Sequence, residues 1–295
     1  MSGRRRLPLA WLVVVPFFAY AVLYLFLPSG QVMVGAFQNN HGGFTFSNVS
    51  AIIHTSYLRS AFEVSIRLSL ETAFWGALFG FLLAYAAIRE GIPRFIRPMF
   101  TTFSGVAANF GGIPLAFAFI ATVGTIGIVT RFLQGAPFHF NLYNWTPPLS
   151  NQPFSLFSFI GVSITYLYFQ IPLMLLVISP AIDGLRREWR EASSNLGASS
   201  FQFWRYVGMP VLLPSIISAF ILLFGNAFAA YATAYALTSG TGLNIVPIVI
   251  GNDLTGNVLS NPHEGQALAF GMFAVLAVMM LIYVPLQRRT SRWAR

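Results

Sequence analysis

Two residue types are missing from this sequence of 295 residues, which has no cysteine and no lysine. The absence of cysteine excludes disulfides, thiolate metal ligands and a cysteine nucleophile. The absence of lysine excludes a P-loop, whose lysine contacts the β- and γ-phosphates of a nucleotide. Charge is also scarce, because charged residues make up 8% of the chain, whereas soluble domains carry about 25%. Thiol chemistry and nucleotide hydrolysis by a P-loop are therefore ruled out for this chain.

Apolar side chains are abundant instead. They account for 56% of the residues and include 30 phenylalanines, which places the chain among membrane proteins. A helix needs about 20 apolar residues to cross a bilayer. Six runs are at least about that long, at 7–28, 64–88, 98–129, 154–179, 211–237 and 266–285. We therefore expect an all-α integral membrane protein with six transmembrane helices.

The third run is too long for one straight crossing. Gly111, Gly112 and Pro114 are expected to bend it, and the glycines of the sequence GTIG at 124–127 are expected to end it. A short external or re-entrant helix is then predicted over 125–133. Irregular backbone at membrane depth is tolerated only where protein or water covers it.

The arginines predict the orientation in the membrane. Fourteen of the 17 lie in four segments on one side of a six-span pattern, namely the head 1–6, the hinge 89–97, the polar segment 183–210 and the tail. The positive-inside rule assigns this side to the cytoplasm, so both termini are expected there. The net charge of +9 then reflects membrane orientation, and no nucleic-acid partner is expected. The head and the first run also resemble a secretory signal peptide, but no cleavage site follows, so a retained span is favoured.

Residues able to carry catalysis are sparse. The histidines fall in predicted external loops, far apart and without metal-ligand spacing, at His41, His54, His139 and His263. No activated nucleophile, paired-carboxylate motif or glycine-rich phosphate cradle is evident. We therefore expect no catalytic site, no metal and no cofactor in this chain. A membrane-embedded enzyme is the weakest hypothesis.

Polar side chains inside two of the runs favour a transport path instead. The candidates to line a water-filled cavity are Asn109, Asn226, Tyr231, Thr233 and Tyr235. The alternative is that each polar group bonds a neighbouring helix and serves packing alone. Glu63, Arg67 and Glu71 share one helical face, either as a charge ladder at the interface or as a stripe that faces the bundle interior.

The polar segment 183–210 lies between two apolar runs. Its first half predicts a short helix over 185–194, ended by Gly197, which adopts a left-handed conformation without a side-chain penalty. A second short helix is predicted over 199–207, after which Pro210 forces a new direction. A helix–turn–helix on a membrane face suits a groove on a soluble partner, and a solvated linker is the alternative.

The spacing inside this segment can be compared with a known pattern. The triplet Glu191-Ala192-Ser193 is followed after three residues by Gly197, and after nine more by Val207, Met209 and Pro210. The stretch resembles the EAA loop of binding-protein-dependent ABC importer permeases, E-A-A-x3-G-x9-I-x-L-P. Ser193, Val207 and Met209 depart from that pattern by small or conservative replacements.

The resemblance implies a type I ABC importer permease fold with a MetI-like transmembrane domain. A five-helix core is expected over 63–290, preceded by 1–62 with the first span and followed by a tail at 291–295. The implied partners are a dimer of cytoplasmic ATPases that bind ATP and Mg²⁺, a second permease, an extracytoplasmic substrate-binding protein and the lipid of the cell (inner) membrane. For the second permease we favour a different chain.

In that family the EAA loop forms a coupling helix that sits in a groove of the ATPase. The coupling residues carried over to this sequence are Arg187, Arg190, Glu191, Ala192, Gly197 and Pro210. The flanking sequence looks most like permeases for spermidine/putrescine, ferric iron and phosphonates. A polyamine is therefore favoured as cargo, with ferric iron or a phosphonate as alternatives. A stand-alone secondary carrier or channel is a further alternative, which predicts ionisable residues deep in the spans.

Overall fold

The computed structural model describes residues 10–39, 41–88, 95–147, 152–238, 243–255 and 262–290. Within these ranges the chain is almost entirely helical, and the β-type pairing there is one isolated bridge between Gln38 and Phe44. Six helical segments are long and apolar enough to cross a membrane, at Val14–Gly35, Ser56–Ala87, Gly112–Gln134, Phe159–Asp183, Ser200–Phe228 and His263–Pro285. The prediction of an all-α protein with six transmembrane helices is confirmed.

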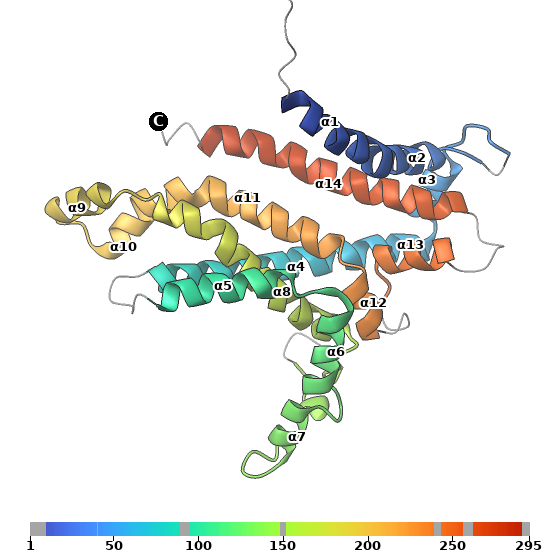
Figure 1. The fold of residues 1–295 in the computed structure, drawn as a ribbon. Helices are drawn as coiled ribbons and strands as arrows, with labels where there is room; N and C mark the ends of the chain where they lie inside the picture. The colour runs from blue at the N-terminus through green and yellow to red at the C-terminus, as the bar shows by residue number, and fades with distance from the viewer. Residues whose placement is uncertain are drawn as a thin grey trace, which may run out of the picture. The chain divides into compact units, whose positions relative to one another are not determined.

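The chain divides into two compact units, Met1–Arg59 with Val249–Val275 and Ser60–Ile248 with Leu276–Arg295. The N-terminal part of the first unit contains α1 (Ala10–Ala21), a π-helical turn (Val22–Phe26), α2 (Leu27–Gly35) and α3 (Ser47–His54) (Figure 1). The first helical run extends beyond the predicted end at Pro28, because that proline lies in the first turn of α2, where its missing N–H costs nothing. Buried Asn48 donates to the carbonyl of Gln38 at 2.8 Å and closes the loop between α2 and α3.

The second unit is built on a close pair of long helices, α4 (Ser56–Ile88) and α8 (Phe159–Asp183). A Cβ atom on Gly76 would lie 2.7 Å from the Cβ of Gln170, and one on Gly80 would lie 2.5 Å from the Cβ of Met174. The two glycines are one turn apart, so they form a smooth face on α4 against which α8 packs. Glycine at these two positions therefore allows α4 and α8 to pack closely.

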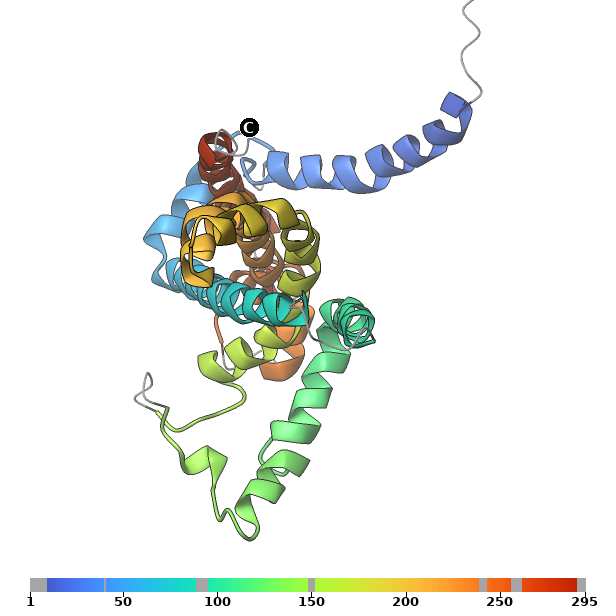
Figure 2. The same cartoon turned by 90° about the vertical axis from the view of Figure 1, so that its left-hand side faces the viewer.

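The third apolar run forms three helices, α5 (Ile96–Asn109), α6 (Gly112–Val123) and α7 (Ile128–Gln134). The predicted bend lies between α5 and α6, where Gly112 has a left-handed φ of +72°. In both views α6 and α7 run steeply away from α4 and α8 (Figures 1 and 2). The predicted short helix over 125–133 is present as α7, which begins three residues later.

The predicted fifth span, 211–237, is interrupted, which the sequence did not reveal. It forms α11 (Met209–Phe228) and α12 (Ala232–Thr238), with a break at 229–231. The Tyr166 hydroxyl donates to the Ala230 carbonyl at 2.7 Å, so a tertiary contact satisfies backbone that a continuous helix would have paired. Two further helices follow α12, namely α13 (Val246–Thr255), between the predicted fifth and sixth spans, and α14 (Pro262–Thr290).

Candidate functional site

The polar segment begins with α9 (Arg187–Asn195), a helix without a buried residue. Its end is a complete Schellman motif, in which the Ala198 N–H donates to the Ser193 carbonyl at 3.0 Å and the Gly197 N–H donates to the Ser194 carbonyl at 2.9 Å. Gly197 has a φ of +78°, the left-handed conformation that the sequence predicted. Because no atom lies within 4 Å of a Cβ built on Gly197, backbone conformation alone favours glycine there.

The second short helix starts at a capping box and continues into a membrane span. Ser199 caps α10 (Ser200–Phe203) in a reciprocal pair of hydrogen bonds with Gln202. A π-helical turn (Trp204–Gly208) follows and passes directly into α11. The expectation that Pro210 forces a new direction is therefore wrong. Pro210 lies in the first turn of α11 after a wider turn, where its ring and missing N–H are tolerated.

Three large apolar side chains of this segment are strongly exposed. Leu196 is 88% exposed, Phe201 71% and Tyr206 69%. Exposed apolar side chains that cluster on one segment mark interaction sites. Solvated linkers have no need of them.

The predicted coupling residues of α9 and its C-terminal turn are all exposed. Both arginines among them also have contacts inside the segment. The Arg187 Nε atom lies 3.4 Å from a Glu191 carboxylate oxygen, one turn along α9. The Arg190 guanidinium lies 5.8 Å from the centre of the Phe203 ring. Both contacts are solvent-exposed and weak, so a partner can replace them at little cost.

An aromatic joint connects the segment to α4. The Trp204 ring meets the Tyr85 ring edge-to-face at a centroid distance of 4.9 Å, and Phe81 lies at 6.4 Å. A Cβ on Gly208 would lie 2.8 Å from the Trp204 ring, so glycine leaves the space that the indole fills. Sequence reasoning missed this joint, because two aromatic residues at the end of one span do not reveal which later aromatic residue they meet.

At the other end of α11, an open cavity of about 480 Å³ lies between two helix breaks. One break separates α5 from α6 and the other separates α11 from α12. The lining residues are Ala108, Asn109, Gly111, Gly112, Phe169, Asn226, Ala229, Ala230, Tyr231, Ala232 and Thr233. These described lining residues include no charged side chain, and the polar groups among them are amides, hydroxyls and backbone.

Four of the five predicted path residues line this cavity, namely Asn109, Asn226, Tyr231 and Thr233. The fifth, Tyr235, stacks on Tyr231 with ring centroids 5.2 Å apart. The Gly112 N–H donates to the Thr233 hydroxyl oxygen at 2.7 Å and so ties one helix break to the other. Sequence reasoning missed Phe169 and the alanines at 229 and 230, which carry no polar signal.

The charged stripe on α4 lies away from this cavity. Arg67 is exposed, and its guanidinium lies 5.1 Å from the centre of the Phe159 ring. Glu63 is exposed and Glu71 is half-buried. No residue of the stripe is among the described lining residues of the cavity.

A family comparison assigns most of the chain. Residues 76–293 match the model of the family described as "Binding-protein-dependent transport system inner membrane component". The match includes the polar segment and every lining residue of the cavity.

The names of individual relatives give different cargoes. A probable sulfate transport system permease protein of Prototheca wickerhamii is 25% identical over 75% of this chain and 77% of its own length. A spermidine/putrescine transport system permease protein of Salmonella typhimurium is 23% identical over 92% of this chain and 91% of its own length. A putative ferric transport system permease protein of Haemophilus influenzae is 22% identical over 98% of this chain, which spans only 43% of that protein.

Solved structures agree on the fold. A chain from a bacterial ABC transporter that imports the acidic polysaccharide alginate superimposes with a TM-score of 0.72 at 15% identity, over 95% of both chains. A chain of an inward-facing methionine ABC transporter gives a TM-score of 0.52 at 14% identity, over 80% of this chain and 99% of the other. At these identities the likeness concerns the fold alone.

Proposed function

Because the chain belongs to the family of binding-protein-dependent transport system inner membrane components, it is the permease subunit of an ABC importer, and we propose that it moves a small solute by alternating access. Its six apolar helices make it a multi-pass inner-membrane protein. ATP and Mg²⁺ are bound by a partner ATPase dimer, since this chain has no lysine for a P-loop. The other proposed partners are a second, different permease chain and an extracytoplasmic binding protein.

One observation carries the mechanism, and it is the continuous helix that runs from the turn after α9 to the cavity. The capping box at Ser199 starts a helix that runs without a break over Ser200–Phe228, and its far end contributes Asn226 to the cavity lining. At 1.5 Å per residue these 29 residues extend over roughly 40 Å. A stiff helix of that length transmits a displacement of one end to the other.

The exposed α9 is the part that we propose docks in the ATPase groove on the cytoplasmic side. Glu191 and Ala192 present the first half of the docking face, and Leu196 presents an apolar side chain at its end. Gly197 fixes the turn that carries the chain back toward α10. When ATP closes the ATPase dimer, α9 moves with the groove, and α11 moves with α9.

The cavity is the part that we propose opens first to one side of the membrane and then to the other. Discontinuous helices that meet at a cavity leave backbone groups available to a solute while protein covers the break. The hydrogen bond from Gly112 to Thr233 makes α6 follow when α11 and α12 move. Asn109, Asn226 and Tyr231 then change their exposure together.

A polyamine is the cargo that we propose, in preference to ferric iron or a phosphonate. The stacked pair of Tyr231 and Tyr235 offers ring faces to a cation, which cation–π attraction favours by about 0.5–2 kcal/mol. An anion would require basic groups, and the described lining of the cavity has none. The polyamine permease of Salmonella typhimurium also matches along nearly the whole of both chains.

The test is reconstitution with and without the ATPase. The purified chain with its ATPase, second permease and binding protein in lipid vesicles should take up putrescine only when ATP is supplied. Uptake by this chain alone under an ion gradient would instead identify a secondary carrier. Titration of the binding protein with putrescine, ferric iron and methylphosphonate then decides the cargo, and tight binding of either of the last two would contradict the polyamine assignment.

A further inference from the structure

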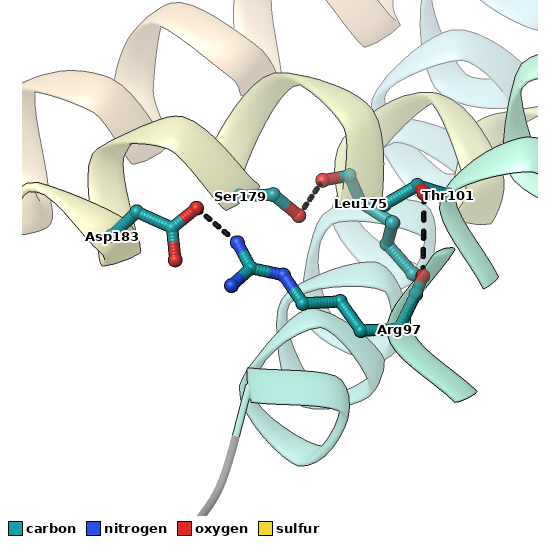
Figure 3. Close-up of polar contacts among 5 residues, drawn as sticks. All are labelled: Arg97, Thr101, Leu175, Ser179 and Asp183. Carbon is teal, nitrogen blue, oxygen red and sulfur yellow. Dashed lines mark hydrogen bonds and ion pairs between the residues drawn. The ribbon is translucent and has the colours of Figure 1, made fainter. Parts of the chain in front are cut away.

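An ion pair joins the helix that leads into α9 to a helix that ends at the cavity. Figure 3 shows Arg97, in the first turn of α5, reaching across to Asp183, the last residue of α8, and Nη2 of Arg97 donates to Oδ2 of Asp183. The residues are 86 positions apart in the sequence. Their side chains are 46% and 39% exposed, so the pair lies at the protein surface.

Each of these charges is unfavourably placed with respect to its own helix. The N-terminus of a helix is the positive end of its dipole, and Arg97 adds a positive charge there. The C-terminus is the negative end, and Asp183 adds a negative charge there. The two helix ends therefore repel their own side chains, and each side chain is compensated by the other helix. Such an arrangement favours a link between helices over the stability of either helix alone.

The neighbouring hydroxyls make no such link. The Ser179 hydroxyl donates to the Leu175 carbonyl of its own helix at 2.6 Å, and the Thr101 hydroxyl donates to the Arg97 carbonyl at 3.2 Å (Figure 3). Of the contacts drawn there, only the ion pair crosses from α5 to α8. Among the described residues, it is thus a polar connection between these two helices at the end nearest α9.

The position of the pair relates it to the movement of α9. Asp183 is separated from α9 by only three residues, Gly184, Leu185 and Arg186. The far end of α5 is Asn109, which lines the cavity. At that end the rings of Phe110 and Tyr168 meet at a centroid distance of 6.2 Å, so α5 and α8 are connected near both ends of α5.

We propose that Arg97 and Asp183 are positioning residues that make α5 and α8 move as one body when α9 moves. This rests on the proposed function of α9 as the coupling helix. The ion pair passes the displacement of the α8–α9 corner to α5 and through it to Asn109. It complements the connection through α11. The movement of α9 then reaches both helix breaks at the cavity, the one after α5 and the one after α11.

The experiment uses the whole transporter in vesicles and measures ATP hydrolysis and putrescine uptake together. The variants are Arg97→Asp, Asp183→Arg and the double exchange of the two charges. Each single variant should lower uptake per ATP hydrolysed by about tenfold, while ATP hydrolysis stays within about twofold of the unaltered protein. The double exchange should restore uptake per ATP hydrolysed to at least about a third of the unaltered value. Ser179→Ala and Thr101→Val are matched controls on the same face, and both should behave as the unaltered protein.

A second readout needs no substrate. Because the chain has no cysteine, spin labels can be placed at Met99→Cys on α5 and Ile164→Cys on α8 before assembly, and both sites are exposed. In the otherwise unaltered protein, the distribution of distances between the two labels should be narrow and should not change when ATP binds. In each single variant, ATP binding should broaden this distribution. In the double exchange the distribution should stay narrow.

Two results would overturn the proposal. One is normal coupling and a narrow label distance in both single variants, and the other is an exchange that restores neither readout. Failure of the proposed function would look different, because the unaltered transporter would then show no ATP-dependent uptake. If a single variant assembles poorly, the exchange and its label distance still decide the question.

Discussion

At the scale of single residues, Gly197 has a conformational requirement that is separate from any contact. Its left-handed backbone would cost another residue about 1–2 kcal/mol, with asparagine the mildest replacement. We predict that Gly197→Val unwinds the end of α9 and lowers uptake per ATP hydrolysed in reconstituted vesicles. Gly197→Asn should retain most of the coupling. Equal loss in both variants would show that an open surface, and not the turn, is what glycine provides.

Trp204 shows why some tertiary contacts of the polar segment are visible only in the structure. Its sequence neighbours predict a short helix and nothing more. The edge-to-face contact with Tyr85 arises because α4 ends beside the π-helical turn that begins at Trp204. A single sequence contains no signal for that meeting.

At the scale of elements, the two helix breaks depend on different physics. The break before Gly112 could be predicted, because two glycines and a proline lie together. The break at 229–231 could not, because alanine and tyrosine do not interrupt helices. It is stabilised from outside by the Tyr166 hydroxyl on the Ala230 carbonyl. At Pro210 the sequence predicted a change of direction that the structure does not have, because the π-helical turn before this proline accommodates it.

The hydrogen bond between the two breaks can be tested by Thr233→Val. The change removes the acceptor of the Gly112 N–H at a half-buried site, and an unpaired group of this kind costs about 1–3 kcal/mol. Thermal unfolding in detergent should show a clear loss of stability. Thr165→Val is the control, because that buried hydroxyl bonds only the Gly161 carbonyl of its own helix, at 2.9 Å. A control as destabilised as the variant would argue against the link.

At the scale of the whole molecule, hydropathy and composition were enough to predict six membrane helices, and the spacing of Glu191, Gly197 and Pro210 was enough to indicate a family. Cargo was not predictable, because the cavity is formed by residues from α5, α6, α8, α11 and α12 that no local pattern groups together. The sequence pattern around Gly197 was readable because it lies in one short segment. The sequence predicted the cavity residues only as isolated polar positions, and the structure shows that Asn109 and Asn226 line the same cavity.

Orientation in the membrane is the whole-molecule prediction. The cysteine-free chain allows single thiols to be placed at Leu196→Cys on the α9 side and at Phe138→Cys in the loop after α7, both exposed. A membrane-impermeant maleimide added to intact cells should label position 138 and leave position 196 unlabelled until the cells are opened. The arginine distribution is the reason for this expectation. The reverse pattern of labelling would invert the proposed topology.

The central claim is that α9 couples ATP hydrolysis to transport, and a charge reversal at Glu191 tests it most directly. Glu191→Arg in the assembled transporter should lower ATPase binding and uptake per ATP hydrolysed by about tenfold, equivalent to about 1.4 kcal/mol. Glu188→Arg makes the same charge change on the same exposed helix, outside the matched pattern, and should leave both within about twofold. Equal behaviour of Glu191→Arg, Glu188→Arg and the unaltered chain would contradict the account.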